Sequence, residues 1–155
     1  MNHKNITKSG KYNCVQGTFY PSCPEKYKGT SNPRFKSKLE YKMMRMCDKS
    51  PHVINWSYER IVIPYVDKSR HNTTHNYYMD FKVTMSTKNG PQTFLVEVKS
   101  KKETEKPKNS KRKKPENYKK EVETWVRNKC KWSAAEKSAR RRGWRFVLFT
   151  EDQLD

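Results

Sequence analysis

The sequence lacks the long apolar segments that a membrane-spanning or secreted chain needs. No run approaches the roughly 18 apolar residues required to cross a bilayer, and the first residues, MNHKNITKSGKYN, contain no apolar signal-peptide stretch. We therefore expect a soluble protein that is not secreted and has no membrane partner. Hydrophobic residues make up only 32% of the 155 residues, which suits one modest core, so one folded domain is the expected body of the protein.

Closely paired cysteines are also missing. The four cysteines are widely and irregularly spaced and form no CxxC pair: Cys14, Cys23, Cys47 and Cys130. This spacing argues against a structural zinc site, and free thiols are the expectation in a reducing cytosol. Cys47 lies at helical spacing among apolar residues, where we expect it to act as a small buried hydrophobic side chain.

Acidic residues are scarce beside the basic ones. The chain has 35 Lys and Arg against 16 Asp and Glu, which gives a formal net charge of +19. Neutralising phosphates releases condensed counterions, so such a chain is expected to bind DNA or RNA with a strong salt dependence. An acidic membrane surface is the alternative polyanion, and the absence of apolar segments disfavours it.

Residues 1–32 are expected to form a basic arm, and residues 33–155 the main domain. The arm is polar and punctuated by Gly and Pro, and we expect its aromatic residues to pin it against the body: Tyr12, Phe19, Tyr20 and Tyr27. The domain opens with Asn32-Pro33, a typical N-cap followed by a first helical residue. Apolar spacing predicts an amphipathic helix from there to about Asp48, with Glu40 beside its apolar stripe.

Three strands are predicted next, over residues 57–66, 75–85 and 92–99, which are rich in β-branched and aromatic residues. Asn89-Gly90 between the second and third strands is a hairpin-turn signal, and the following Pro91 favours a loop longer than two residues. The first connection is longer and polar. An antiparallel three-stranded meander is therefore expected.

A basic excursion, residues 99–120, separates the third strand from a long helix. This helix is predicted to begin near Pro115 and to stop at Gly143. WRFVLFT predicts a fourth strand, and Thr150 is expected to cap a final short turn. A strand, helix and strand in series usually form a right-handed crossover with parallel strands. The predicted fold is α/β, with an αβββαβ core and a mixed sheet flanked by helices.

The predicted strands bring a group of charged side chains together. In QTFLVEVK the strand period puts Glu97 and Lys99 on one face, and hairpin pairing brings Asp80 close to Glu97. Two close carboxylates repel each other unless a cation offsets their charge. Mg²⁺ or Mn²⁺ prefers such oxygen ligands and activates water. We expect Asp80 and Glu97 to hold the metal, Lys99 to assist the water or the phosphate, and Glu40 to complete the metal shell.

Each of these patterns also has a simpler interpretation. An alternating Glu-x-Lys is more often a solvated strand face with an ion pair than a catalytic pair. His75 either ends a loop or touches the scissile phosphate or the metal-bound water. The same direct role is open for Tyr77, but its place on the strand face opposite Asp80 favours packing. Glu59 either adds a metal ligand or pairs with a neighbouring Lys or Arg.

HNYYMDF followed by FLVEVKS resembles the signature of the PD-(D/E)XK nucleases, with Met79-Asp80 at the Pro-Asp position and Glu97-Val98-Lys99 as ExK. Met79 departs from the usual Pro, a residue that shapes the backbone and does not bind metal. The order of segments from GTFYPSCPEKYKG to KWSAAEKSARRRGWRFVLFTEDQL is similar to that of the head-completion nucleases of T-even-type tailed phages. It is more distantly similar to the transposase nuclease subunit of the Tn7 type.

The resemblance implies a restriction-endonuclease-like fold with four catalytic positions: Glu40, Asp80, Glu97 and Lys99. It also implies Mg²⁺ or Mn²⁺ as cofactor, and endonuclease and exonuclease activity on packaged DNA that prepares filled heads for tail joining. The implied partners are double-stranded DNA and phage portal, head or neck proteins, with no small-molecule substrate. The implied location is the cytoplasm of the infected bacterial host, or the virion.

Two basic clusters are the expected contacts with the DNA backbone, where they would give affinity without sequence specificity. Together with His75 the candidate DNA-binding residues are Lys111, Arg112, Lys113, Lys114, Arg140, Arg141 and Arg142.

For Trp125 and Trp132 core packing is favoured over base stacking. Two other functions stay open: a non-catalytic DNA-binding or virion-joining protein, and a restriction-type or transposon-end endonuclease.

Overall fold

The centre of the computed structural model is a four-stranded sheet, and the structure describes residues 7–9 and 14–154. The sheet has the order β4-β7-β8-β9, formed by β4 (Val53–Tyr58), β7 (Phe81–Thr87), β8 (Gly90–Val98) and β9 (Arg145–Phe149). The first three strands are antiparallel and β9 runs parallel to β8. The long helix α2 (Pro115–Arg141) makes the crossover between them. The mixed sheet and the parallel crossover are as predicted.

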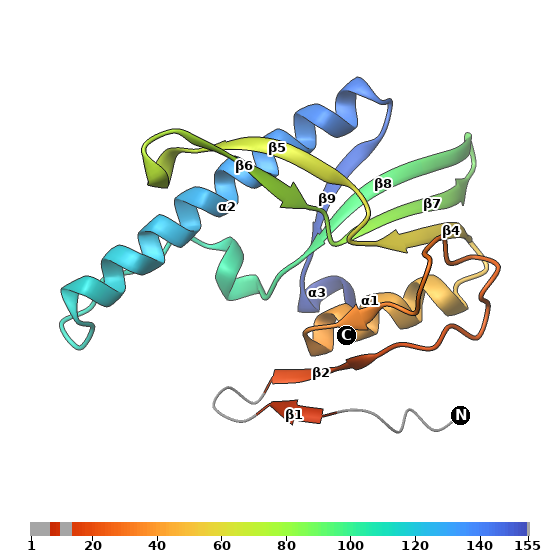
Figure 1. Cartoon of the computed structure of the whole chain (residues 1–155), viewed down its shortest axis with the longest axis horizontal. Coiled ribbons are helices and arrows are strands. Elements are labelled where there is room, and N and C mark those ends of the chain that lie inside the picture. The colour runs from red at the N-terminus through yellow and green to blue at the C-terminus, as the bar shows by residue number, and fades with distance from the viewer. Residues whose placement is uncertain (1–6, 10–13, 155) are drawn as a thin grey trace.

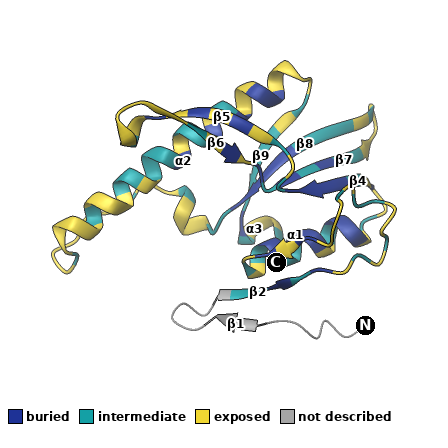
Figure 2. Cartoon of the chain, in the orientation of Figure 1, coloured by how far each residue is buried: buried dark blue, intermediate teal, exposed yellow. Residues whose placement is uncertain are grey.

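Helices cover both faces of this sheet (Figure 1). On one face Met43, Met44 and Cys47 of α1 (Lys38–Lys49) pack against Val96 and Val98. On the other face Ala135 and Ala139 of α2 pack against Leu95. Alternate residues of β8 therefore point into two separate cores, as the strand period requires. Buried residues gather in β4, at the end of β8 and on α1 (Figure 2). The α/β class is confirmed.

The antiparallel order of the three predicted strands is confirmed, but the first and the second are each broken in two. The segment 57–66 divides between β4 and β5 (Val62–Asp67), with Glu59 between them at φ 52°. The segment 75–85 divides between β6 (Thr73–Tyr78) and β7. Strands β5 and β6 pair only with each other, through a hairpin that closes on the 3₁₀ turn η1 (Lys68–Arg70). The run of β-forming residues is continuous in both segments, so strand propensity alone gave no sign of either break.

Helix α1 begins later than predicted. Its N-cap is Ser37, whose hydroxyl accepts a hydrogen bond from Glu40 N at 3.1 Å, and not Asn32. The residues just after Pro33 instead form the short strand β3 (Arg34–Phe35), paired with β2 (Cys14–Thr18), which also pairs with β1 (Thr7–Ser9). Phe35 is buried in the first core, so core packing outweighs the local helix signal.

The hairpin between β7 and β8 is tighter than predicted. Thr87 pairs with Gly90, so only two residues form the turn, and Gly90 has φ 95°. The expected longer loop is wrong because Pro91 remains in the ladder opposite Ser86. On its other side β8 pairs with β9 only from Phe94 onward, so no strand there needs the N–H that Pro91 lacks.

The segment expected to be an arm contributes side chains to the core. Phe19 is 1% exposed, and the ring centroid of Tyr27 lies 4.7 Å from that of Trp56. Tyr20 is exposed, and Tyr12 lies outside the described residues. The Asp48 carboxylate accepts hydrogen bonds from Ser22 N and Cys23 N and holds the segment at α1. The division at residue 32 stays a prediction.

The ends of the remaining elements agree with the sequence. Gly143, at φ 72°, follows α2, and Thr150 accepts a hydrogen bond from Asp152 N at the start of α3 (Glu151–Leu154).

Cys23, Cys47 and Cys130 are free thiols, and Cys47 is fully buried; the side chain of Cys14 is not among those described. No helix in the described ranges combines the length and hydrophobicity of a membrane span.

Candidate active site

The break between β6 and β7 positions Asp80 at the end of β8. Phe81 pairs with Val96, so the residue before Phe81 lies across from Glu97. The Asp80 Oδ2 atom accepts a hydrogen bond of 2.9 Å from Val98 N, which fixes one carboxylate oxygen beside the ExK segment. The predicted approach of Asp80 to Glu97 is therefore present in the fold.

Glu97 is 4% exposed and has a partner on each carboxylate oxygen. The Tyr77 hydroxyl donates a hydrogen bond to Oε2, and Lys99 Nζ lies 3.5 Å from Oε1. Tyr77 packs in the second core as expected, but its hydroxyl contact with Glu97 was not predicted. In an unbroken strand Tyr77 would face away from Asp80. Because the strand ends at Tyr78, the two side chains converge on Glu97.

The electrostatics of this group favour a bound cation. Burial raises the pKa of Asp80, and the charge of Glu97 raises it further. Burial also raises the pKa of Glu97, against the opposing effects of Lys99 and the Tyr77 hydrogen bond. Burial lowers the pKa of Lys99, but the charges of Glu97 and Asp80 outweigh it, and the net pKa is raised. Two hard oxygen donors that repel each other in a partly dry site fit a divalent ion such as Mg²⁺ or Mn²⁺.

Glu40 lies near this group but has partners of its own. Its Oε2 atom accepts hydrogen bonds from Lys36 N at 2.6 Å and from the Tyr58 hydroxyl at 3.0 Å, and its charge contributes to raising the pKa of Asp80. Among the side chains that the structure describes, those of residues 15–154, no three His, Cys, Asp or Glu gather closely enough to hold a metal ion by themselves. The third metal ligand expected at Glu40 therefore stays a prediction.

Glu59, one of the residues left open, is bound in an ion pair. Lys36 Nζ lies 2.5 Å from Glu59 Oε1. The simpler of the two interpretations, pairing with a neighbouring lysine, is the one that the structure contains.

Lys131 is a residue of the site that the sequence analysis missed. It reaches over from α2, with Nζ 5.5 Å from the ring centroid of Tyr77 and 5.8 Å from that of Tyr65. Burial lowers the pKa of Lys131, and its charge lowers the pKa of Glu97. Its position in the sequence could have indicated this, because Lys131 lies four residues before Ala135 and therefore on the packing face of the helix. A second ammonium group, supplied by α2, therefore acts on Glu97 in addition to that of Lys99.

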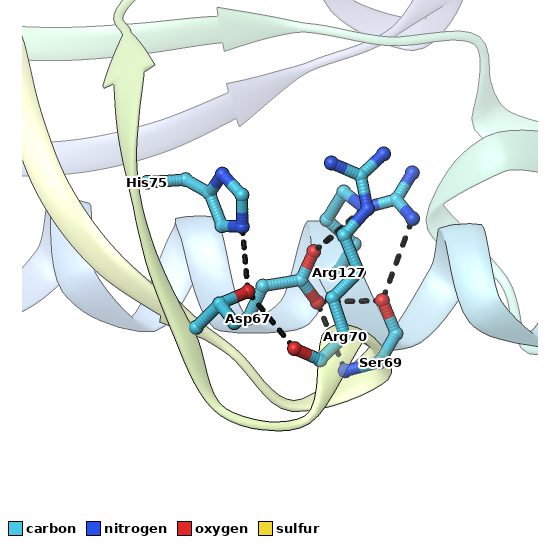
Figure 3. Close-up of polar contacts among 6 residues, drawn as sticks. Asp67, Ser69, Arg70, His75 and Arg127 are labelled. Atoms are coloured by element: carbon cyan, nitrogen blue, oxygen red, sulfur yellow. Dashed lines mark hydrogen bonds and ion pairs between the residues drawn. The ribbon is translucent and has the colours of Figure 1, made fainter.

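The β5–β6 hairpin that carries Tyr77 is anchored to α2 by a buried ion pair (Figure 3). Asp67 is fully buried and accepts hydrogen bonds from Ser69 N at 2.9 Å and Arg127 Nε at 2.8 Å. Arg70 Nε lies 3.7 Å from the same carboxylate. This anchor sets the position of the hairpin over α2 and, through it, the position of the Tyr77 hydroxyl.

His75 lies in the same hairpin, and its Nε2 is 2.7 Å from the hydroxyl of Thr73 (Figure 3). Its ring lies 6.0 Å from that of Tyr65. The hydrogen bond described for His75 therefore stays within the hairpin, and a contact of His75 with DNA stays a prediction.

The two basic clusters lie at opposite ends of α2. The helix has 27 residues, so its ends are about 40 Å apart at roughly 1.5 Å per residue. Lys111, Arg112 and Lys114 are exposed at the N-terminal end. Lys113 is held by Glu121, with Nζ and Oε2 2.9 Å apart. At the other end the Arg142 guanidinium lies 5.1 Å from the centroid of the Trp144 ring. A DNA contact at either cluster stays a prediction.

Comparison with known proteins points to one family. The profile described as TnsA-like endonuclease N terminal matches residues 50–151. The head completion nuclease of Enterobacteria phage T4 is 34% identical over 142 residues, which cover 89% of this chain and 92% of that protein. The matched range contains Asp80, Glu97, Lys99 and Lys131, and the longer alignment is consistent with one shared fold over most of the chain.

Proposed function

Because the chain belongs to the TnsA-like family of PD-(D/E)XK nucleases, we propose that it is a metal-dependent deoxyribonuclease with Asp80, Glu97 and Lys99 at its active site. The observation that carries the proposal is the convergence of two mutually repelling carboxylates beside a half-buried lysine. Ionisable groups whose pKa is shifted by burial and by a close charge cluster at functional sites.

Asp80 and Glu97 would hold the metal ion, with Glu40 as a further ligand. When bound, Mg²⁺ or Mn²⁺ supplies Lewis-acid stabilisation of the phosphate charge and acidifies water. The chain's own contribution is positional. Val98 N orients Asp80, and the Tyr77 hydroxyl orients Glu97.

Lys99 and Lys131 would act on the phosphate itself. Lys99 Nζ, held beside Glu97, is available to orient the attacking water or to offset negative charge that builds on the phosphate oxygens. Lys131 adds a second positive charge from α2. Preorganised cations at a developing charge are worth more in a partly dry site than in water.

The proposed substrate is double-stranded DNA. The net charge of +19 favours a polyanion over any small molecule, and the basic excursion begins at Lys99 itself. By analogy with the head completion nuclease of phage T4, the proposed role is endonuclease and exonuclease processing of packaged phage DNA before heads and tails join. The proposed partners are portal, head or neck proteins, and the proposed location is the host cytoplasm or the virion.

The test is cleavage by Glu97→Ala. This variant is expected to cut plasmid at least about a hundredfold more slowly than the wild type, since the metal site loses a ligand, and to keep its affinity for DNA. Glu136→Ala, which removes an exposed glutamate of α2, is the matched control and is expected to cut normally. Cutting by Glu97→Ala at the wild-type rate would contradict the assignment.

A second candidate is a restriction-type or transposon-end endonuclease, which the match to a TnsA-like profile favours. The two candidates differ in their products. An enzyme that cuts without sequence preference turns linear DNA into fragments of many lengths, which run as a smear on a gel. A sequence-directed enzyme gives discrete fragments on the same gel.

A further inference from the structure

A cavity of about 570 Å³ lies between the basic excursion and the N-terminal half of α2. Residues 102–108, which include the end of the 3₁₀ turn η2 (Lys101–Thr104), form one wall, and Trp125 and Asn128 belong to the other. Lys113 joins the walls, since its Nζ contacts Glu121 Oε2 at 2.9 Å and donates a hydrogen bond of 2.6 Å to the Lys108 carbonyl. The cavity is therefore framed by defined contacts between two segments that Figure 1 shows side by side.

Both walls lead to the candidate active site. On the excursion, the Glu103 carboxylate accepts hydrogen bonds from the backbone N of Ser100 at 3.1 Å and from its hydroxyl at 2.8 Å, one residue after Lys99. On the helix, Asn128 lies three residues before Lys131, whose Nζ lies 5.5 Å from the ring centroid of Tyr77, the hydrogen-bond donor to Glu97. Positions three residues apart lie on the same face of a helix. The two walls of the cavity thus belong to the segments that carry Lys99 and Lys131, although the cavity shares no residue with the candidate site.

The lining of the cavity combines Trp125 with five lysines and three glutamates, Glu103, Glu105 and Glu121, so positive charge is in excess. Trp125 is only partly buried and lines the cavity, whereas Trp132, one of the two tryptophans expected to pack, is 6% exposed in the interior. Four exposed lysines line the same cavity as Trp125: Lys102, Lys106, Lys108 and Lys120. From α2 itself, Lys129 Nζ lies 5.7 Å from the centroid of the Trp125 ring. An aromatic ring with nearby lysines is the arrangement that stacks nucleobases and tracks the phosphates of unpaired strands. The volume is within the range of roughly 300–1,000 Å³ found for small-ligand sites.

We propose that this cavity binds an unpaired nucleotide of a DNA strand end, with the base against Trp125 and the adjacent phosphates against Lys102 and Lys120. The proposal rests on the proposed nuclease function and adds a substrate preference to it. Stacking on Trp125 is a contact that a paired terminal base cannot make in full, so DNA with an unpaired terminus would be bound more tightly than fully paired DNA.

The experiment measures binding without cleavage, with the full chain in EDTA. The probe is a duplex that carries one unpaired 2-aminopurine nucleotide at its end, compared with the same duplex fully paired. Stacking on tryptophan is expected to quench the probe. Trp125→Ala is expected to lose the quenching. It is also expected to lower the ratio of the affinity for the unpaired end to the affinity for the paired end by roughly tenfold. Trp125→Phe, which keeps an aromatic face, is expected to retain most of that ratio.

Lysine variants keep the test independent of the folding of Trp125→Ala. Lys120→Ala, at an exposed position, is expected to lower the same ratio about two- to threefold, and Lys137→Ala, exposed on the far part of α2, is expected to leave it unchanged. An unquenched probe with the wild type, or an affinity ratio equal to one, overturns the proposal. Cleavage of a covalently closed circle by the wild type with Mg²⁺ tests the nuclease function separately, because a circle has no strand end.

Discussion

Glu97 is held from three elements at once. The Tyr77 hydroxyl reaches it from β6, Lys99 from the end of β8, and the charge of Lys131 from α2. Each contact favours the ionised carboxylate, while burial opposes it. A buried acid whose charged form is supported in this way is oriented before any substrate binds, and preorganisation of this kind is what electrostatic catalysis requires.

The role of Lys131 is tested by comparing Lys131→Ala with Lys131→Arg. Loss of the positive charge beside Glu97 is expected to lower the single-turnover cleavage rate by roughly a hundredfold, the cost of removing one stabilising donor, with a smaller change in DNA affinity. The Arg variant is expected to recover part of the rate. Lys137→Ala, exposed on the same helix, serves as the control. Equal losses in Lys131→Ala and the control would refute a role at the site.

The ion pair between Asp67 and Arg127 is expected to matter for stability. Arg127→Ala leaves a buried carboxylate without its closest cation, and the free energy of unfolding at pH 7 should fall by about 1.5–3 kcal/mol. Urea unfolding measures this loss, with Lys137→Ala as the control. A free energy of unfolding unchanged by Arg127→Ala would show that the pair contributes nothing.

The same pair predicts an acid dependence. Burial alone would raise the pKa of Asp67, but hydrogen bonds from Ser69 and Arg127 outweigh it and hold the pKa below its ordinary value. A carboxylate with a depressed pKa stabilises the fold above its unfolded pKa of about 3.9, and the contribution is lost as the pH falls through the lower folded pKa. The wild type should therefore lose stability below about pH 4, and Arg127→Ala should lose less over that range.

At the scale of elements, the breaks in the two long β segments organise the site. The breaks at Glu59 and at Met79-Asp80 face each other: Glu59 N donates to the Asp80 carbonyl, and Met79 N to the Ile61 carbonyl. Both strands thus leave the main sheet at the same level and continue as the β5–β6 hairpin over α2. The ladder ends beside Asp80, the proposed metal ligand, and the hairpin brings the Tyr77 hydroxyl back to Glu97.

The two basic clusters at the ends of α2 make separable predictions. If Lys111, Arg112 and Lys114 each contact a phosphate, their joint replacement by Ala should reduce the slope of log K against log salt by roughly 2.7, about 0.9 for each contact. Lys113 is left in place because it is bound to Glu121. The matched variant replaces Arg140, Arg141 and Arg142 with Ala. An unchanged slope in both variants would exclude the clusters as DNA contacts.

At the scale of the molecule, the basic residues that would bind DNA are separate from the residues that would cleave it. The excess of positive charge is spread over the arm, the excursion and α2, whereas the proposed metal ligands are three acidic residues near the end of one sheet. DNA binding should therefore persist when cleavage is lost.

EDTA tests this separation. Retardation of DNA on a gel is expected to be the same with and without EDTA at fixed salt, while plasmid cleavage is expected only with Mg²⁺ or Mn²⁺. A protein that retards DNA and leaves plasmid intact in both metals would instead be a non-catalytic DNA-binding or virion-joining protein. The plasmid cleavage rate, measured at increasing concentrations of Mg²⁺ or Mn²⁺, gives the metal dependence quantitatively.

Much of the architecture was predictable because its signals are local. The spacing of apolar residues gave α2 and most of α1, Asn89-Gly90 gave the hairpin, and residues 145–149 gave the parallel strand. The alternation of β8 correctly separated Val96 and Val98 from Leu95 and Glu97. These features depend on neighbours within a few residues, which a sequence displays directly.

The sequence by itself determined the charge, the ExK segment and its hairpin with Asp80, because each is written in composition or in near-neighbour spacing. Only the tertiary structure decided where the strands break, which side chains reach Glu97 and where the cavity beside Trp125 lies. Tyr77 is 20 residues from Glu97, Arg127 is 60 from Asp67, and Lys131 approaches from another layer of the fold. Contacts at such separations are chosen by packing of the whole chain, since no local propensity favours one distant partner over another.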